Sequence, residues 1–397
     1  MKAALDESVL ESADRLAEAD REGLLRAVAT AGAQLRESLT LTAEADLPGH
    51  LADLRPRAVL LAADPPAEDA AFALAALAAG PGAAAPVVRL DGPALPVWAG
   101  ATDTLLAVTH SSTGRAVAVL ADAAARRGLT VLGAGAVDSP LQEACGRNRA
   151  PYVGLPPGRH PRAAFWGLLA PLLVAAGELG LLTDTEEDLA DVADLLDALA
   201  ERSRPTGETF GNPAKSLALD VGESLPVAWG TSAPTGAATR RLAGQLAGIA
   251  GHPALWGTLP GAVYRLGGVL AGGVPGADDI FRDRVEEAGT IGPRLLLVRD
   301  ADEAVDVRRL VEQLVADAIR RGVPVTELAA DETAGPVGRL ASLVGLLDFT
   351  AVYVGLASRG ASGAADSGGG ASGGGAAFGG EGLDSTDGGT TDLGGER

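Results

Sequence analysis

The 397-residue chain contains a single cysteine, Cys145, so it can form neither an intrachain disulfide nor a cysteine-based metal cluster. Aromatic residues make up only 3% of the chain although 47% of it is hydrophobic. Its cores must therefore be built mainly from Ala, Leu and Val. The four histidines are scattered, and no two stand at the spacing of metal ligands: His50, His110, His160 and His252. We expect no metal site and no cofactor.

Basic residues are also few: 32 Lys and Arg stand against 52 Asp and Glu, which gives a formal net charge of -20. This balance argues against nucleic acid and anionic membrane surfaces as partners. The first 16 residues have the pattern of an acidic amphipathic helix, not of a signal peptide. No uninterrupted apolar run is long enough to span a bilayer. We therefore expect a cytoplasmic protein.

The length allows two domains, and short apolar runs alternate with helical patterns along most of the chain. This alternation predicts α/β architecture with doubly wound parallel sheets. In the first half, strands are expected at residues 58–63, 86–90, 104–108, 129–132 and 151–155, and a long apolar helix at 161–182. In the second half, strands are expected at 226–230, 294–298 and 325–328, helices at 237–250 and 338–357, and a glycine-broken segment at 267–273.

Five segments follow from these patterns. They are N-terminal helices over residues 1–50, a first α/β unit over 51–182, a helical connector over 183–204, a second α/β unit over 205–358, and a tail over 359–397. The tail consists mainly of Gly, Ser, Ala, Asp and Thr. It cannot bury enough apolar area to offset the entropy of ordering, so we expect it to be disordered.

The stretch from Asp103 to Arg115 joins an apolar strand to a hydroxyl-rich turn, Thr109-His-Ser-Ser-Thr113, and then to a helix. Backbone N–H groups at such a turn and the helix dipole favour an anion, and the hydroxyls can donate to phosphate oxygens. The alternative is that Ser and Thr only cap the helix. Both interpretations remain open at this point.

Other polar residues also allow two interpretations. Arg240 and Arg241 either add positive charge to a cleft or lie on an exposed helix face, and we favour the exposed face. Lys215 is expected to be structural, at a helix start after Pro213. The pairs Asp278-Asp279 and Glu286-Glu287 are spaced like metal ligands, but a solvated charged surface fits their polar stretch better.

Four segments in succession resemble the sugar isomerase (SIS) domain: residues 103–113, 126–132, 139–141 and 158–164. Two further segments, Asn212-Pro-Ala-Lys215 and residues 343–357, extend the resemblance to the bifunctional phosphoglucose/phosphomannose isomerase family, in particular its divergent actinobacterial members. The resemblance covers residues 20–358. It implies two SIS subdomains, a homodimer, and a sugar-phosphate site where the subdomains meet.

The resemblance also implies site residues. Thr109, Ser111 and Thr113 would bind the phosphate of the substrate, with Ser112 in place of the family's glycine. Arg162 would stabilise the enediolate, a role that suits a guanidinium because it is always charged and has a fixed fork of donors.

The acid–base groups of the family have no counterpart at the matching positions. Aldose–ketose isomerisation needs a base, usually a glutamate, and an acid–base group to open the ring, for which a histidine is suited. The glutamate position falls on Gly248 and the histidine position on Tyr264. His252, four residues after Gly248, is a candidate replacement for the missing acid–base group. The simpler interpretation is a turn or N-cap histidine before Pro253. Arg162, Tyr264 and His252 are therefore the candidate catalytic residues.

The family's first glycine-rich loop is replaced by Ala63-Asp-Pro-Pro66, which adds a negative charge and removes backbone donors near the phosphate. Two functions follow. One is a divergent isomerase that interconverts glucose 6-phosphate or mannose 6-phosphate with fructose 6-phosphate through an enediol. The other is an inactive SIS protein that binds a sugar phosphate as a sensor, or as a partner of another sugar-phosphate enzyme.

Overall fold

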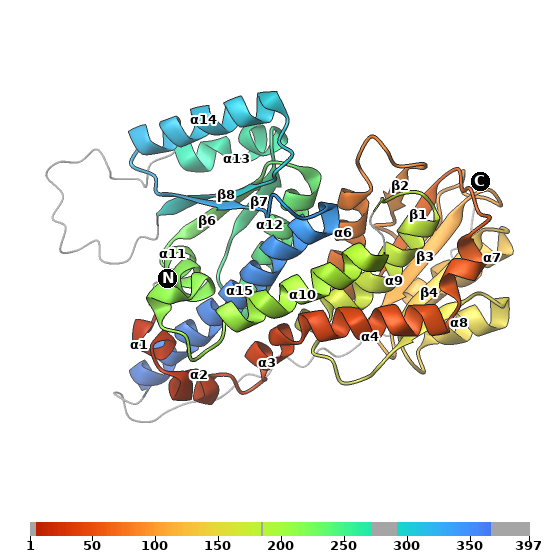
Figure 1. The fold of residues 1–397 in the computed structure, drawn as a ribbon, viewed down its shortest axis with the longest axis horizontal. Coiled ribbons are helices and arrows are strands. Elements are labelled where there is room, and N and C mark those ends of the chain that lie inside the picture. Colours follow the sequence, from red (N-terminus) through yellow and green to blue (C-terminus); the bar gives the residue numbers. More distant parts are fainter. Residues whose placement is uncertain (1–4, 184–185, 272–291, 367–397) are drawn as a thin grey trace, which may run out of the picture.

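The computed structural model describes residues 5–183, 186–271 and 292–366. It contains two parallel sheets flanked by helices, which confirms the predicted α/β class (Figure 1). The first sheet has the order β2-β1-β3-β4-β5 and the second the order β7-β6-β8-β9. The strands are β1 (Val59–Ala63), β2 (Val87–Arg89), β3 (Thr104–Thr109), β4 (Thr130–Ala136), β5 (Tyr152–Leu155), β6 (Leu225–Gly230), β7 (Leu255–Thr258), β8 (Pro293–Arg299) and β9 (Val325–Ala329).

Strand β3 lies at the centre of the first sheet, and every residue in it is buried. Alternate side chains point to opposite faces of a strand, so its apolar run serves two layers. Leu105 and Ala107 pack toward α7 (Ala116–Arg126) and α8 (Pro140–Asn148). Leu106 and Val108 join the main core on the opposite face, with α6 (Glu68–Leu77) and α9 (Phe165–Glu178).

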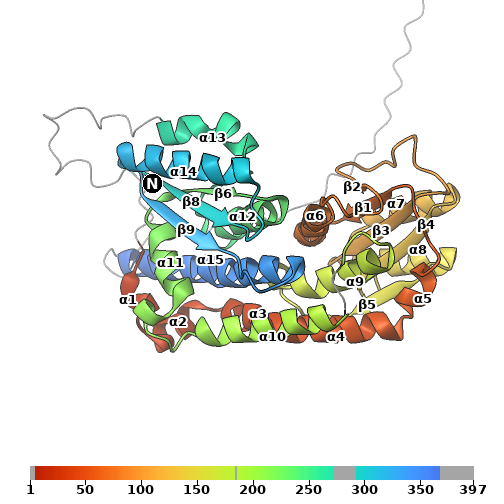
Figure 2. The same ribbon diagram turned by 45° about the horizontal axis from the view of Figure 1, so that its top comes forward.

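In the second sheet, alternate side chains of the strands also point to opposite faces. Trp229 and Leu297 pack toward α13 (Gly261–Ala271) and α14 (Val305–Arg320). Ala228 and Leu296 face the main core, on the side of α12 (Ala233–Gln245) and α15 (Pro336–Asp366). Each sheet is thus covered by helices on both faces, as buried parallel sheets require (Figure 2).

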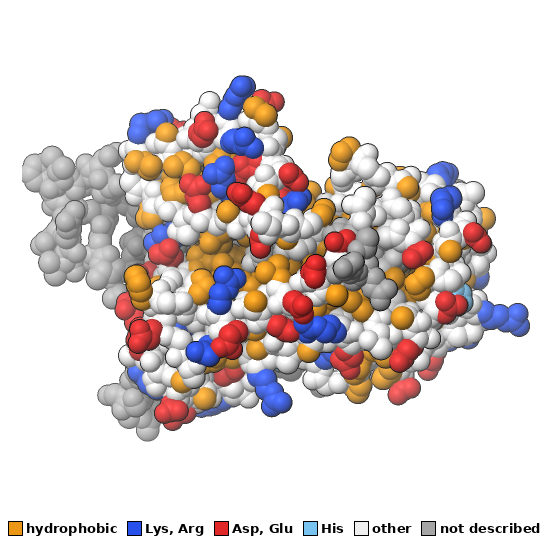
Figure 3. Space-filling view, in the orientation of Figure 1, with side chains coloured by type: hydrophobic (Ala, Val, Ile, Leu, Met, Phe, Trp, Pro, Cys, Tyr) orange, Lys and Arg blue, Asp and Glu red, His pale blue; other side chains and the backbone are white. Residues whose placement is uncertain are grey.

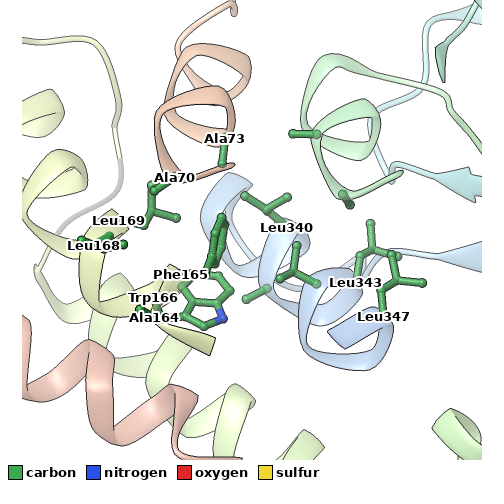
Figure 4. Close-up of a cluster of buried hydrophobic side chains, with 14 of the residues drawn as sticks. Ala70, Ala73, Ala164, Phe165, Trp166, Leu168, Leu169, Leu340, Leu343 and Leu347 are labelled. Atoms are coloured by element: carbon green, nitrogen blue, oxygen red, sulfur yellow. The ribbon is translucent and has the colours of Figure 1, made fainter. Parts of the chain in front are cut away.

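Helix α15 joins the two halves. Figure 4 shows side chains from α6, α9 and α15 packed together, among them Phe165, Leu169 and Leu340. By length and composition, Pro336–Arg359 is apolar enough to cross a membrane, although Arg339 and Asp348 interrupt its apolar run. In this structure 89% of its most apolar window is buried, as in the core helix of a globular protein.

The N-terminal segment and the connector form a layer along one side of the molecule (Figure 2). Its helices are α1 (Glu7–Leu10), α2 (Ala13–Ala19), α3 (Leu24–Ala29), α4 (Ala31–Glu44), α5 (Leu47–Leu51) and α10 (Glu186–Arg202). Arg36 on α4 forms an ion pair with Asp197 on α10 at 2.7 Å. Acidic and basic side chains are interspersed across the face shown in Figure 3.

The remaining short elements are η1 (Pro65–Ala67), η2 (Pro161–Ala163), η3 (Thr209–Gly211), α11 (Pro213–Gly222) and the π-helix η4 (Leu246–Ala250). At the start of α11, Asn212 accepts hydrogen bonds from the backbone of Ala214 and Lys215. The Lys215 ammonium donates to three carbonyl oxygens, those of Leu10, Pro205 and Gly207, at 2.6–2.7 Å. The structural role predicted for Lys215 is confirmed.

Two elements of the second half differ from the sequence prediction. Strand β7 was not expected, and residues 267–271 of the glycine-broken segment belong to the regular helix α13, while residues 272–273 lie outside the described residues. Interior glycines cost a helix about 1 kcal/mol each, but Val263, Leu266 and Leu270 pack against the sheet and outweigh that cost. Helix α15 continues to Asp366, past the expected start of the tail. Residues 367–397, and the acidic pairs at 278–279 and 286–287, lie outside the described residues.

Candidate functional site

The candidate site lies where the strand order of the first sheet reverses, between β1 and β3. Open α/β sheets bind ligands in the crevice at this point, outside the carboxyl ends of the strands. Asp64 follows β1, and the hydroxyl turn follows β3. A cavity of about 200 Å³ lies beside the turn and is lined by residues that follow β3, β4 and β5, including His110, Val137 and Pro156.

The carboxylate of Asp64 lies inside the hydroxyl turn. It accepts hydrogen bonds from the Thr109 hydroxyl at 2.6 Å, the Ser111 backbone N–H at 2.9 Å and the His110 backbone N–H at 3.1 Å. Asp64 is only 8% exposed. The donors that the sequence assigned to a phosphate are therefore directed at a carboxylate of the chain itself.

The remainder of the turn is organised by Ser111. Its hydroxyl oxygen accepts hydrogen bonds from the backbone N–H groups of Thr113 at 3.2 Å and Gly114 at 2.8 Å. Helix α7 begins at Ala116 with no side-chain cap hydrogen bond, so the helix-capping interpretation is wrong. Ser112 and Thr113 are exposed to solvent.

Arg162 lies in η2, after β5, and its backbone is held by the second half of the chain. Its carbonyl oxygen accepts hydrogen bonds from Arg241 Nη2 at 2.9 Å and from Gln245 Nε2 at 2.8 Å. The residue is half-buried, and its guanidinium makes no hydrogen bond or ion pair within the described part of the chain. Arg162 therefore offers a charged group with open donors between the two halves.

Gly248 is the position that the resemblance assigns to the catalytic glutamate, and it lies directly against Arg162. A Cβ atom built on Gly248 would collide with the Arg162 guanidinium. Gly248 is exposed and belongs to η4, which follows α12 without a break. The arginine thus fills the space in which a glutamate side chain would begin.

Tyr264 and His252 take different places. Tyr264 lies on α13 and is 95% exposed, so it is not part of an enclosed site within one copy of the chain. His252 is 2% exposed, and its Nε2 lies 2.9 Å from the carbonyl oxygen of Ser224. Nε2 must therefore carry the proton and donate it. Burial lowers the pKa of His252 below its usual value, which favours the neutral ring.

The structure also places near Arg162 three residues that the sequence interpretation missed: Glu22, His160 and Arg359. The Nε2 atom of His160 is 3.3 Å from a carboxylate oxygen of Glu22. Arg359 donates to the other oxygen of Glu22 at 3.3 Å and to the Ile249 carbonyl at 3.4 Å. No local signal could have paired Glu22 with Arg359, because the two residues lie 337 positions apart in the sequence.

A buried network of ion pairs holds Arg241, the residue that donates to the Arg162 carbonyl oxygen. Arg241, which is 5% exposed, donates to both carboxylate oxygens of Asp348 at 2.8 Å and to Asp69 at 3.2 Å. Its guanidinium lies 4.5 Å from the ring centroid of Phe165. Burial raises the pKa of Asp348, and the paired Arg241 opposes that shift. Because Arg240 also pairs with Glu68 and Asp69, the predicted exposed helix face is wrong.

Comparisons with known proteins show which proteins the sequence and the fold of this chain resemble. The family model of the bacterial phospho-glucose isomerase C-terminal SIS domain matches residues 210–360. A bifunctional phosphoglucose/phosphomannose isomerase from Caldicellulosiruptor bescii is 30% identical over 114 residues. That alignment covers 29% of this chain and 34% of the relative, about a third of its length.

Solved structures show the same fold along most of the chain. A hypothetical protein from Thermus thermophilus has a TM-score of 0.59 at 16% identity, over 88% of this chain and 89% of its own. The tagatose-6-phosphate ketose/aldose isomerase of Escherichia coli has a TM-score of 0.55 at 14% identity, over 87% and 95%. Together these likenesses confirm the predicted SIS resemblance.

Proposed function

We propose that this chain, a SIS-domain protein similar to the phosphoglucose/phosphomannose isomerases, binds a sugar phosphate without isomerising it. It would act as a sensor, or as a partner of another sugar-phosphate enzyme. The observation that carries the proposal is the contact between Arg162 and Gly248. Proton transfer between adjacent sugar carbons needs a base at hydrogen-bond distance, and a guanidinium cannot accept a proton.

Binding is supported by the open guanidinium of Arg162. A guanidinium with unused donors suits a phosphate or an oxyanion. The Glu22–His160 contact supports a second candidate, a divergent isomerase with replaced acid–base groups. In that case Glu22 would be the first residue to test as the base.

The test is calorimetric titration with fructose 6-phosphate beside a coupled isomerase assay on the same preparation. We expect binding without turnover of glucose 6-phosphate or mannose 6-phosphate, and loss of binding in Arg162→Ala. Arg126→Ala, which removes an exposed arginine of α7, is the control and should bind normally. Turnover that is lost in Glu22→Gln would support the divergent isomerase. If the chain shows no binding and no turnover, both candidates are contradicted.

A homodimer and a cytoplasmic location belong to the same proposal. The family resemblance supports the dimer, and the acidic composition of the chain supports the location. Light scattering on the purified chain would give its mass in solution. A monomer at micromolar concentration would contradict the dimer.

A further inference from the structure

We propose that Asp64 is the specificity-determining residue of the hydroxyl turn: its carboxylate occupies the place of a ligand phosphate and closes the turn to phosphate. The proposal rests on the proposed function only in taking this turn as the place where the family resemblance puts the substrate phosphate. It assigns Asp64 a role that goes beyond the negative charge it adds to the site.

The first argument is the direction of the donors. A phosphate bound at a turn of this kind is held by successive backbone N–H groups and nearby hydroxyls. Here the His110 and Ser111 N–H groups and the Thr109 hydroxyl donate to Asp64. Beyond Ser112, whose N–H has no partner among the described residues, the N–H groups of Thr113 and Gly114 donate to the Ser111 hydroxyl oxygen. These donors are already satisfied before any ligand arrives.

The second argument is that Asp64 is held firmly in place. Its carboxylate also accepts a hydrogen bond from the Ala67 backbone at 3.2 Å, which caps η1. Pro65 and Pro66 restrict the backbone that follows and carry no N–H groups of their own to offer a ligand. With the side chain 8% exposed, solvent screens its charge poorly, and a phosphate dianion would meet a like charge at short range.

The third argument comes from the second sheet, where the strand order reverses between β6 and β8. Asp300 lies at that point and accepts hydrogen bonds from the Ser232 hydroxyl at 2.6 Å and from Arg339 Nε at 2.8 Å. Its backbone N–H donates to the Thr231 hydroxyl at 2.9 Å. In the described residues, a carboxylate of the chain therefore lies at each reversal point. The point between β6 and β8 does not offer a second phosphate site in place of the turn after β3.

The test compares phosphate binding by the full chain and its variants in an Arg162→Ala background, so that Arg162 contributes nothing. Asp64→Gly removes the carboxylate and leaves the His110 and Ser111 N–H groups open to inorganic phosphate. We expect its phosphate affinity to exceed that of the Asp64 chain at least tenfold, and its melting temperature to rise with phosphate. The melting temperature of the Asp64 chain should not respond.

Two further variants keep the result interpretable. Asp64→Asn retains one oxygen that can cap η1, removes the charge and replaces the other acceptor oxygen by an amide donor, so it replaces Asp64→Gly if that variant does not fold. Asp103→Asn removes a carboxylate that is 1% exposed, just before the amino end of β3, where it pairs with Arg57. It should lower stability without any gain in phosphate binding.

Equal phosphate affinity in the Asp64 chain and in the folded Asp64 variants would overturn the proposal. A gain shared by Asp103→Asn would also overturn it, because loosening of the fold would then explain the effect. The isomerase assay on the same preparations is a separate readout. Turnover there would contradict the proposed function and leave the comparison of phosphate affinities intact.

Discussion

Replacing Asp348 by alanine should strongly destabilise the protein. The change leaves the Arg241 guanidinium in the core without the two hydrogen bonds, both of 2.8 Å, that neutralise it. Removing one partner of a buried ion pair costs about 3–5 kcal/mol, because the remaining charge stays desolvated. Arg241 keeps its 3.2 Å contact with Asp69, so we expect about 3 kcal/mol, the lower end of that range.

The measurement is urea unfolding followed by circular dichroism, with the free energy of unfolding extrapolated to water. Asp317→Ala is the control: its pair with Arg320 is exposed, so the change should be below about 1 kcal/mol. The double variant Arg241→Met/Asp348→Leu should recover most of the loss, because apolar side chains of similar size avoid the desolvation of charge. A loss below about 1 kcal/mol in Asp348→Ala would refute the reasoning.

Three further predictions concern the site and its support. Gly248→Glu should displace the Arg162 guanidinium, pair with it in its new position and weaken fructose 6-phosphate binding at least tenfold by calorimetry, whereas an unchanged affinity would place the ligand elsewhere. Lys215→Met should cost about 3 kcal/mol or more in urea unfolding, because three carbonyl groups lose a buried donor. Burial lowers the pKa of His252 in the folded chain, so the unfolded chain binds the proton more strongly. The free energy of unfolding should therefore fall as the pH drops below about 6.5, by at most about 1.4 kcal/mol per pH unit, and His252→Gln should reduce this slope.

Strands β1 and β3 of the first sheet could be predicted because their sequences are continuous apolar runs, the pattern of strands buried on both faces. Strand β7 could not, since its four residues lie at a sheet edge with Trp256 partly exposed and give little periodic signal. Helix α13 contains Gly267 and Gly268, which lower helix propensity. Its packing against the second sheet decides the outcome, and packing is not visible in a local sequence window.

Contacts within the site could not be predicted either, because they join residues that are far apart in the sequence. The sequence predicted that Asp64 adds negative charge beside the phosphate turn, but not that it accepts the hydrogen bonds of the turn. That contact depends on the pairing of Ala63 with Val108, which brings the ends of β1 and β3 level. The burial of Arg241 was likewise missed, because its partner Asp348 lies 107 residues away on α15.

The charges of the site explain where a ligand would bind. The resemblance implies a substrate phosphate at the hydroxyl turn, and an arginine and a glutamate at the reacting sugar carbons. In this chain the turn holds its own carboxylate, Asp64, and Gly248 supplies no charge at the glutamate position. The guanidinium of Arg162 is then left without a counter-charge among the described contacts. An anionic ligand would therefore gain most from Arg162 and least from the turn, so Arg162→Ala should abolish sugar-phosphate binding while Thr109→Val, which leaves Arg162 in place, should preserve it.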